Sequence, residues 1–182
     1  MAAVAAHRVS TDVAYPWDQG SKALSADELK RREAWQSRFM PSGAMVAGRV
    51  DRLHWMTFGT PETLPLLYSE QPPLMTKGRQ QAVVRVGALQ SDSEATEAQT
   101  LNWSTAPRGT AVSVRMSGLL WPEAAARIAN SAYVTRERVG KGQVILFSGQ
   151  PNFRGSTRGV GRVWLNALVY GPGLGTSAQV EL

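Results

Sequence analysis

Hydrophobic and polar positions along this 182-residue chain follow two periods, one typical of strands and one typical of helices. Short apolar runs bounded by Gly, Pro and polar residues predict strands; these cover 44–50, 64–68, 82–86, 111–116, 133–139 and 143–148. A first helix is predicted after Ser25, because Ser25-Ala-Asp-Glu28 is a capping box. A second short helix is predicted from Pro122, which suits the first turn of a helix.

The C-terminal third has the clearest pattern. Gly140-Lys141-Gly142 predicts a tight hairpin between two strands, and 144–147 is apolar on both faces, which is typical of a central strand. A loop at 149–155 leads into a helix predicted to run from about 158 to 169 and to end before Gly171-Pro172. Its spacing predicts a buried stripe and an opposite polar stripe; the first comprises Val160, Val163, Trp164, Ala167 and Leu168, and the second Arg158, Arg162 and Asn166.

This order of strands and helices favours an α/β domain with a mixed, mostly parallel sheet and helices on its faces. The segment 89–106, which is rich in Ser, Thr, Ala and Glu, is predicted to be a solvated excursion. Nothing before Ala44 resembles the strong apolar strand that usually opens such a domain.

The composition of the chain excludes several kinds of structure and site. Apolar residues make up 43% of the chain, enough for a sizeable core, yet no apolar run approaches the roughly 20 residues that span a bilayer. The absence of cysteine excludes disulfides, iron–sulfur clusters and a thiol nucleophile. His7 and His54 are the only histidines, which excludes multi-histidine metal sites. The sequence therefore predicts neither a metal nor a cofactor.

The formal charge of +6 is concentrated near the C-terminus. Between Arg136 and Arg162, six basic residues stand against Glu137 alone. The cluster lacks the dense basic run with interleaved aromatics of a single-strand-binding groove, so solvated faces are favoured over nucleic-acid binding. Residues 1–24 contain no secretory signal. The compartment therefore stays open, and a periplasmic or secreted location would need a signal peptide on a longer parent protein.

Three groups of residues are candidates for a site. His54 suits a general base oriented by Asp51, or a loop histidine packed beside aromatic residues, which is the favoured interpretation. Asn152, Phe153 and Arg154 follow a predicted central strand, where ligand contacts are common, although capping, packing and ion pairing explain them as well. Arg158 and Arg162 suit a ligand contact or a solvated helix face.

Several stretches resemble the closing segment of bacterial zinc carboxypeptidase-family proteins, in which a class I glutamine amidotransferase-like domain follows the peptidase domain. The most specific block comprises Gly140–Phe147, Pro151–Gly155 and Arg162–Leu168 with Gly171. The similarity covers about 38–172, and earlier stretches that agree are Pro41–Met45, Val50-Asp51, His54-Trp55, Phe58-Gly59 and Ser117–Glu123.

The resemblance implies a flavodoxin-like, class I glutamine amidotransferase-like three-layer sandwich whose first strands lie before Met1. It divides the chain into an N-terminal segment at 1–24, the domain at 25–172 and a tail at 173–182. The His-x-x-Glu zinc motif of the peptidases is missing, and so are the Cys, His and Glu of the amidotransferases. The resemblance thus implies that this chain by itself is not an enzyme.

The favoured expectation is a non-catalytic accessory domain of a zinc carboxypeptidase-like protein, serving docking, stability or substrate presentation. Its expected partner is the upstream peptidase domain, or a second copy through an exposed sheet edge. The alternative is an independent carbohydrate- or anion-binding module that uses the loop and helix start at 149–162. A hydrolase built around Asp51 and His54 is a third and less favoured hypothesis.

Overall fold

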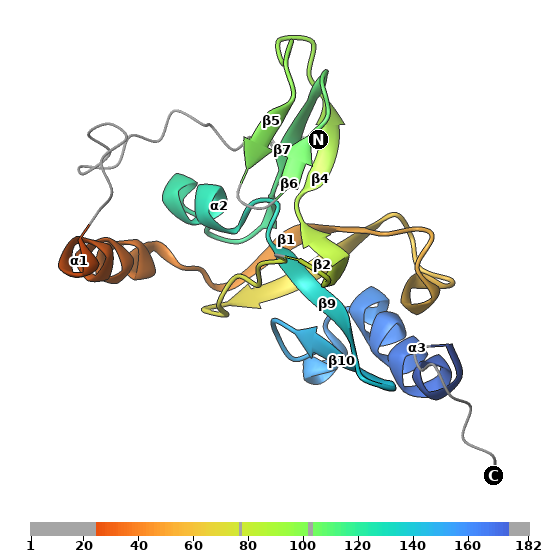
Figure 1. The fold of residues 1–182 in the computed structure, drawn as a ribbon. Coiled ribbons are helices and arrows are strands. Elements are labelled where there is room, and N and C mark those ends of the chain that lie inside the picture. Colours follow the sequence, from red (N-terminus) through yellow and green to blue (C-terminus); the bar gives the residue numbers. More distant parts are fainter. Residues whose placement is uncertain (1–24, 77, 102–103, 175–182) are drawn as a thin grey trace.

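The computed structural model describes residues 25–76, 78–101 and 104–174. Its centre is a six-stranded sheet with the order β10-β9-β3-β1-β2, and β8 adds to it by pairing with β1. The strands are β1 (Ser42–Val50), β2 (Thr63–Ser69), β3 (Gln81–Val86), β8 (Arg115–Ser117), β9 (Ala132–Val139) and β10 (Gly142–Phe147). The sheet curls into a half-barrel (Figure 1).

Each pairing between these strands is antiparallel, which overturns the predicted mostly parallel, flavodoxin-like sandwich. Parallel neighbours need a crossover of a dozen or more residues, usually containing a helix. Among the described residues, the only α-helix between two strands of this sheet is α2 (Pro122–Ile128), which is seven residues long. It joins β8, which pairs with β1, to β9, which pairs with β3. The described part of the chain therefore lacks the repeated strand–helix–strand units that a doubly wound sheet requires.

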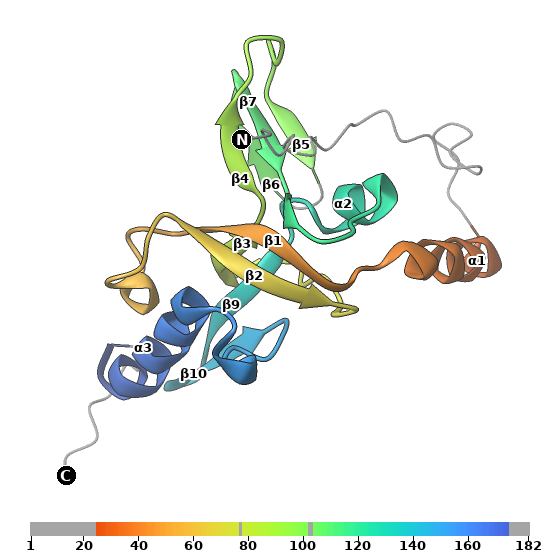
Figure 2. The ribbon, with the colours of Figure 1, turned by 180° about the vertical axis from the view of Figure 1, so that it is seen from behind.

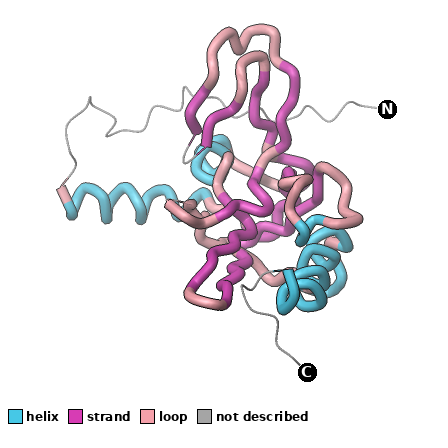
Figure 3. Tube along the Cα trace, turned by 45° about the vertical axis from the view of Figure 1, so that its right-hand side comes forward, coloured by secondary structure: helices cyan, strands magenta, loops and turns pink. Residues whose placement is uncertain are grey.

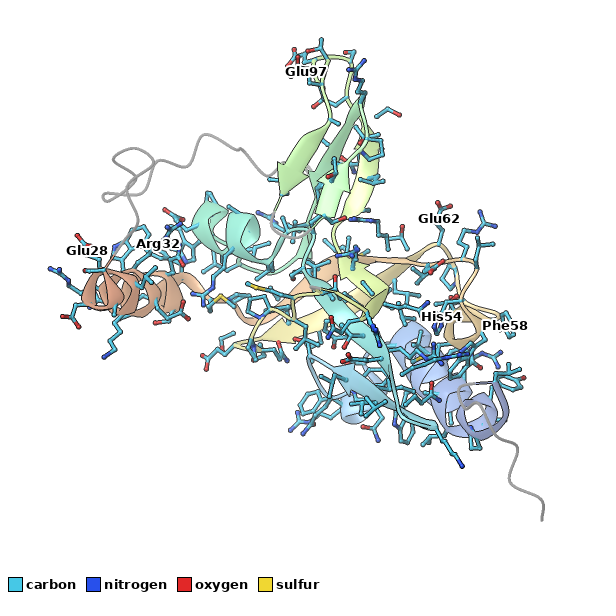
Figure 4. The ribbon with its side chains drawn as sticks, viewed as in Figure 1. Glu28, Arg32, His54, Phe58, Glu62 and Glu97 are labelled. Atoms are coloured by element: carbon cyan, nitrogen blue, oxygen red, sulfur yellow. The ribbon has the colours of Figure 1, made fainter. Side chains whose placement is uncertain are left out.

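Two small ribbons rise from one side of the sheet, and α3 (Arg158–Leu174) lies on the other (Figures 1 and 2). One ribbon pairs β4 (Ala88–Ser91) with β7 (Thr110–Ser113), and the other pairs β5 (Gln99–Leu101) with β6 (Ser104–Ala106). The predicted solvated excursion at 89–106 thus contains strands, and the acidic turn between them carries Glu97 at its tip (Figure 4).

The core lies between the curled sheet and its two covering helices. Val160 and Val163 of α3 are buried, as are Ala124, Ala125 and Ile128 of α2. The sheet contributes large side chains that are almost fully buried: Val46, Leu64, Leu66, Tyr68, Val83, Val84, Val86, Tyr133 and Val134. The position of α3 over β2 is therefore set by apolar burial.

The first helix, α1 (Ala26–Gln36), projects sideways from the rest of the molecule (Figures 1 and 3). The predicted capping box is confirmed, because Ser25 accepts the N–H of Glu28 and the Glu28 carboxylate accepts the N–H of Ser25. A short 3₁₀ turn, η1 (Ser37–Phe39), connects it to β1. None of the described helices is long and apolar enough to span a membrane.

The predicted hairpin at Gly140–Gly142 is confirmed, since β9 and β10 pair in register from Val139 with Gly142 to Val134 with Phe147. The prediction that 144–147 is a central strand is wrong. β10 lies at the edge of the sheet, and Val144 and Leu146 on one of its faces are exposed. An apolar run shows that a strand is hydrophobic but does not show whether both faces are covered.

Candidate functional site

The loop that follows β10 forms one wall of a hollow near the C-terminal third. The hollow has a volume of about 760 Å³ and lies between the ends of β2 and β10. Its lining comprises Gly43, Leu67, Ser69, Gln71, Phe147, Ser148, Gly149, Gln150, Pro151 and Phe153. None of these lining side chains is ionisable, so the hollow offers amides, hydroxyls and apolar surface.

Two polar side chains of this hollow, those of Ser148 and Gln71, form hydrogen bonds within the fold. Ser148 donates its hydroxyl to the carbonyl of Pro72 at 3.0 Å, and the Gln71 side chain accepts the backbone N–H of Ser69. Nucleophilic catalysis by a serine needs an adjacent general base. No histidine or carboxylate lines the hollow, so Ser148 is a structural residue here.

The predicted loop residues are only partly brought to this hollow. Phe153 lines it and is 40% exposed, whereas Asn152 and Arg154 are not among its lining residues. Arg154 lies over the Phe153 ring, with its guanidinium carbon 5.2 Å from the ring centre. Arg154 has a positive φ of 49°, an uncommon conformation for a residue other than glycine. This segment, η3 (Phe153–Gly155), is a single 3₁₀ turn.

Arg158 and Arg162 are exposed on α3, as predicted, but the third member of their expected stripe is not. Asn166 is 5% exposed, and its Nδ2 donates to the carbonyls of Met56 and Phe58, at 2.9 Å each. The prediction of a solvated stripe is therefore wrong at Asn166. The side chain fastens α3 to the 3₁₀ turn η2 (Trp55–Thr57) and to the residue after it.

His54 immediately precedes η2 and is 7% exposed beneath α3 (Figure 4). Its Nδ1 accepts the N–H of Met56 at 3.2 Å, and its ring lies 5.3 Å from that of Trp55. Burial lowers the pKa of His54, and the charge of Asp51 opposes this shift. The Asp51 carboxylate instead accepts the N–H of Leu53. The contacts of His54 therefore agree with the packed-histidine interpretation.

The outward face of α3 was assigned incorrectly from the sequence. Leu168 was predicted to be buried, yet it is 55% exposed, and Leu165 and Val169 are 50% and 68% exposed. The spacing i, i+3 and i+4 of these three residues places them on one face. We call Leu165, Leu168 and Val169 the α3 stripe. These three residues recur at helical spacing in the sequence, and treating them as a second apolar face of the helix could have identified the α3 stripe.

The helix also runs further than expected. It continues through Gly171 and Pro172 to Leu174, and Gly171 is buried. Gln143 of β10 donates its side-chain N–H to the carbonyl of Gly171 at 3.0 Å, which holds the end of the helix against the sheet. At the other end, a Cβ on Gly159 would lie 2.5 Å from Leu64, so a glycine is needed for this close approach.

In the part of the chain that the structure describes, no group of three His, Cys, Asp or Glu side chains is arranged to hold a metal ion. Comparison with protein-family models finds no family that matches this chain. Comparisons with curated proteins and with solved structures likewise find no match.

Proposed function

We propose that this chain is a non-catalytic docking module of a zinc carboxypeptidase-like protein, and that it contacts the peptidase domain through the α3 stripe. The observation that carries the proposal is the exposure of Leu165, Leu168 and Val169, three large aliphatic side chains on one face of a helix whose other face is already buried.

A helix on the surface of an isolated domain normally has one apolar face and one polar face. α3 is apolar on both, because Val160 and Val163 face the core while the stripe faces outward. Contiguous exposed apolar surface of this kind is typical of a contact site for another protein. Covering the stripe would remove apolar surface from water, which is the main favourable contribution to association.

The charged residues on the same helix fit a protein contact. Arg158 lies two turns before Leu165 and Arg162 one turn before it, and both are exposed. Arginine is enriched in protein interfaces, where its planar fork pairs with carboxylates at the rim of an apolar centre. A partner with an apolar patch bordered by acidic residues would complement this face.

The choice of partner rests on the resemblance to zinc carboxypeptidase-family proteins. The residues that carry its most specific block build β10, η3 and about half of α3, including Leu165 and Leu168 of the α3 stripe. The alternative, a separate carbohydrate- or anion-binding module at 149–162, has less support. Asn152, Arg154, Arg158 and Arg162 do not line a common hollow with Phe153.

The test measures binding of the purified chain to the zinc carboxypeptidase-like peptidases encoded in its own genome, together with peptidase and glutaminase assays of the chain alone. We expect the double variant Leu165→Glu with Val169→Glu to weaken binding more than tenfold, because two charges would be placed in an apolar contact. Leu53→Glu is the matched control, since Leu53 is 95% exposed and lies on another element.

Equal binding by the double variant and the wild type would show that the α3 stripe is not the contact face. Absence of binding to every such peptidase would remove the proposed partner. Robust turnover by the purified chain in either assay would contradict a non-catalytic role.

A further inference from the structure

Two arginines face each other across the centre of the sheet. Arg49 of β1 and Arg85 of β3 are directly opposite in the antiparallel register, so their side chains leave the same face of the sheet. Like charges in directly opposite positions destabilise a strand pair. Such a pair therefore calls for a physical explanation.

Neutral acceptors hold both guanidinium groups. Arg49 donates to the carbonyl of Gly87 at 3.0 Å and to the side-chain oxygen of Asn130. Arg85 donates to the backbone carbonyl of Asn130 at 3.0 Å and to the hydroxyl of Thr76 at 3.2 Å. Asn130 is fully buried, has a φ of 61° and donates its side-chain N–H to Ser104. Both arginines thus converge on one rigid residue.

The charges of the pair are not balanced by an acid. Among the described residues, neither Arg49 nor Arg85 forms an ion pair with a carboxylate. Burial, and then the charge of Arg85, lowers the pKa of Arg49 to about 10, which leaves Arg49 protonated at neutral pH. Burial also lowers the pKa of Arg85. Asp51 is nearby, but it is exposed and its carboxylate accepts the N–H of Leu53.

The two arginines open onto a hollow of about 280 Å³ between β1 and β3, lined by Arg49, Val50, Asp51, Ala82 and Arg85. We propose that this hollow is a binding site for a phosphate group. Each guanidinium has five N–H donors, and the hydrogen bonds described above occupy one donor on each of its two terminal nitrogens. A phosphate with a charge near −2 neutralises both arginines and accepts from the remaining donors.

A purely structural role explains the arrangement less well. Tying β1 and β3 to Asn130 requires hydrogen-bond donors but no charge, and a neutral amide side chain would supply donors without placing two cations side by side. An anion bound between the two groups would relieve the repulsion within the pair.

The test titrates the full chain with inorganic phosphate by calorimetry, with sodium chloride at matched ionic strength as the salt control and succinate as the carboxylate probe. We expect saturable one-to-one binding of phosphate. Arg49→Gln and Arg85→Gln should each weaken it about tenfold or more, because each removes a charge-assisted contact while keeping an amide donor. Arg108→Gln, an exposed change of the same charge, should leave the affinity within about twofold.

Because either glutamine variant could be unstable, the wild-type protein supplies a second measurement. The side-chain Nε–H resonances of Arg49 and Arg85 should shift during the phosphate titration and not during the chloride titration. Asp51→Asn should strengthen binding, because it removes a negative charge from the lining.

Several results would overturn the proposal. No saturable phosphate binding, an equal loss of affinity in Arg108→Gln, or unmoved Nε–H resonances of both arginines would each do so. Tighter binding of succinate than of phosphate would reassign the ligand to a carboxylate and overturn the phosphate assignment.

Discussion

The helices α1 and α3 were both predicted from the sequence, but they are held in place by different forces. α1 begins with a complete capping box, yet none of its eleven residues is buried. α3 buries Val160, Val163, Asn166 and Gly171. Local hydrogen bonding can therefore start a helix, whereas burial decides whether that helix becomes part of the core.

The described contacts of α1 with the rest of the molecule lie toward its C-terminal end. The rings of Trp35 and Phe39 contact edge to face at 4.7 Å, and Phe39 reaches Trp121 at 6.3 Å. Glu33 pairs with Arg127 of α2. Leu29, nearer the N-terminal end of the helix, is 52% exposed, and Glu28 points away from the rest of the molecule (Figure 4).

The largest effect on stability is expected from a substitution that breaks the attachment of α3. Asn166→Ala leaves the carbonyls of Met56 and Phe58 without their donor beneath the helix. Leaving buried acceptors unsatisfied should lower the free energy of unfolding by about 3 kcal/mol. Denaturant unfolding measures this decrease in the free energy of unfolding. Leu165→Ala, the same substitution type one position earlier on the outward face, is the control and should change stability by under about 1 kcal/mol.

A comparable loss in both variants would mean that side-chain hydrogen bonding does not fasten α3.

An effect of intermediate size on stability is expected when the pH changes the protonation of His54. Burial lowers the pKa of His54 in the folded protein, so the unfolded chain binds a proton more readily. Stability is then fully present above the unfolded-state pKa of about 6.5 and decreases as the pH falls below it. We expect the denaturant midpoint to decrease between pH 7.5 and pH 5.5. His54→Gln should flatten this pH dependence of the midpoint. An unchanged slope in that variant would show that other titratable groups cause the pH dependence.

The smallest effect is expected at α1. Ser25→Ala removes the hydroxyl that caps the helix, but no core contact depends on it. The free energy of global unfolding should change by less than about 0.5 kcal/mol, while amide exchange in 26–30 speeds up. The Ser25 hydrogen bonds lower the pKa of Glu28, so in the variant this pKa should rise toward its ordinary value, as an NMR titration would show. A large fall in global stability would show that α1 contributes to the core after all.

Most strands of the central sheet were located from the sequence, but β4, β5 and β6 were missed, and the arrangement of the strands was not predicted. The predicted strand at 111–116 is divided into β7 and β8, which belong to different sheets. Runs such as 64–68 and 82–86 became β2 and β3 with small changes at their ends. The prediction of a mixed, mostly parallel sheet rested on the order of strands and helices, which ends in a strand, a loop and a helix. Among the described residues no strand follows α3, so this final unit contains no crossover between parallel strands. Alternating hydrophobicity states which residues favour a strand, and carries no information on which strands become neighbours.

The site residues show the same limit. Leu168 and Asn166 were assigned to the wrong faces because consecutive helix positions differ by about 100°, and the boundary of a buried face depends on what packs against it. Arg49 and Arg85 were not singled out, since each is one arginine within an apolar strand. Only the antiparallel register places them opposite each other.

By itself, the sequence determined the local features of this protein. These are the capping box of α1, the glycine hairpin between β9 and β10, the proline start of α2 and the lack of cysteine, and each depends on residues within a few positions of one another. The tertiary structure alone decided the antiparallel order of the strands, the burial of Asn166 and the pairing of Arg49 with Arg85. These depend on contacts between segments far apart in the chain, whose energies no local pattern contains.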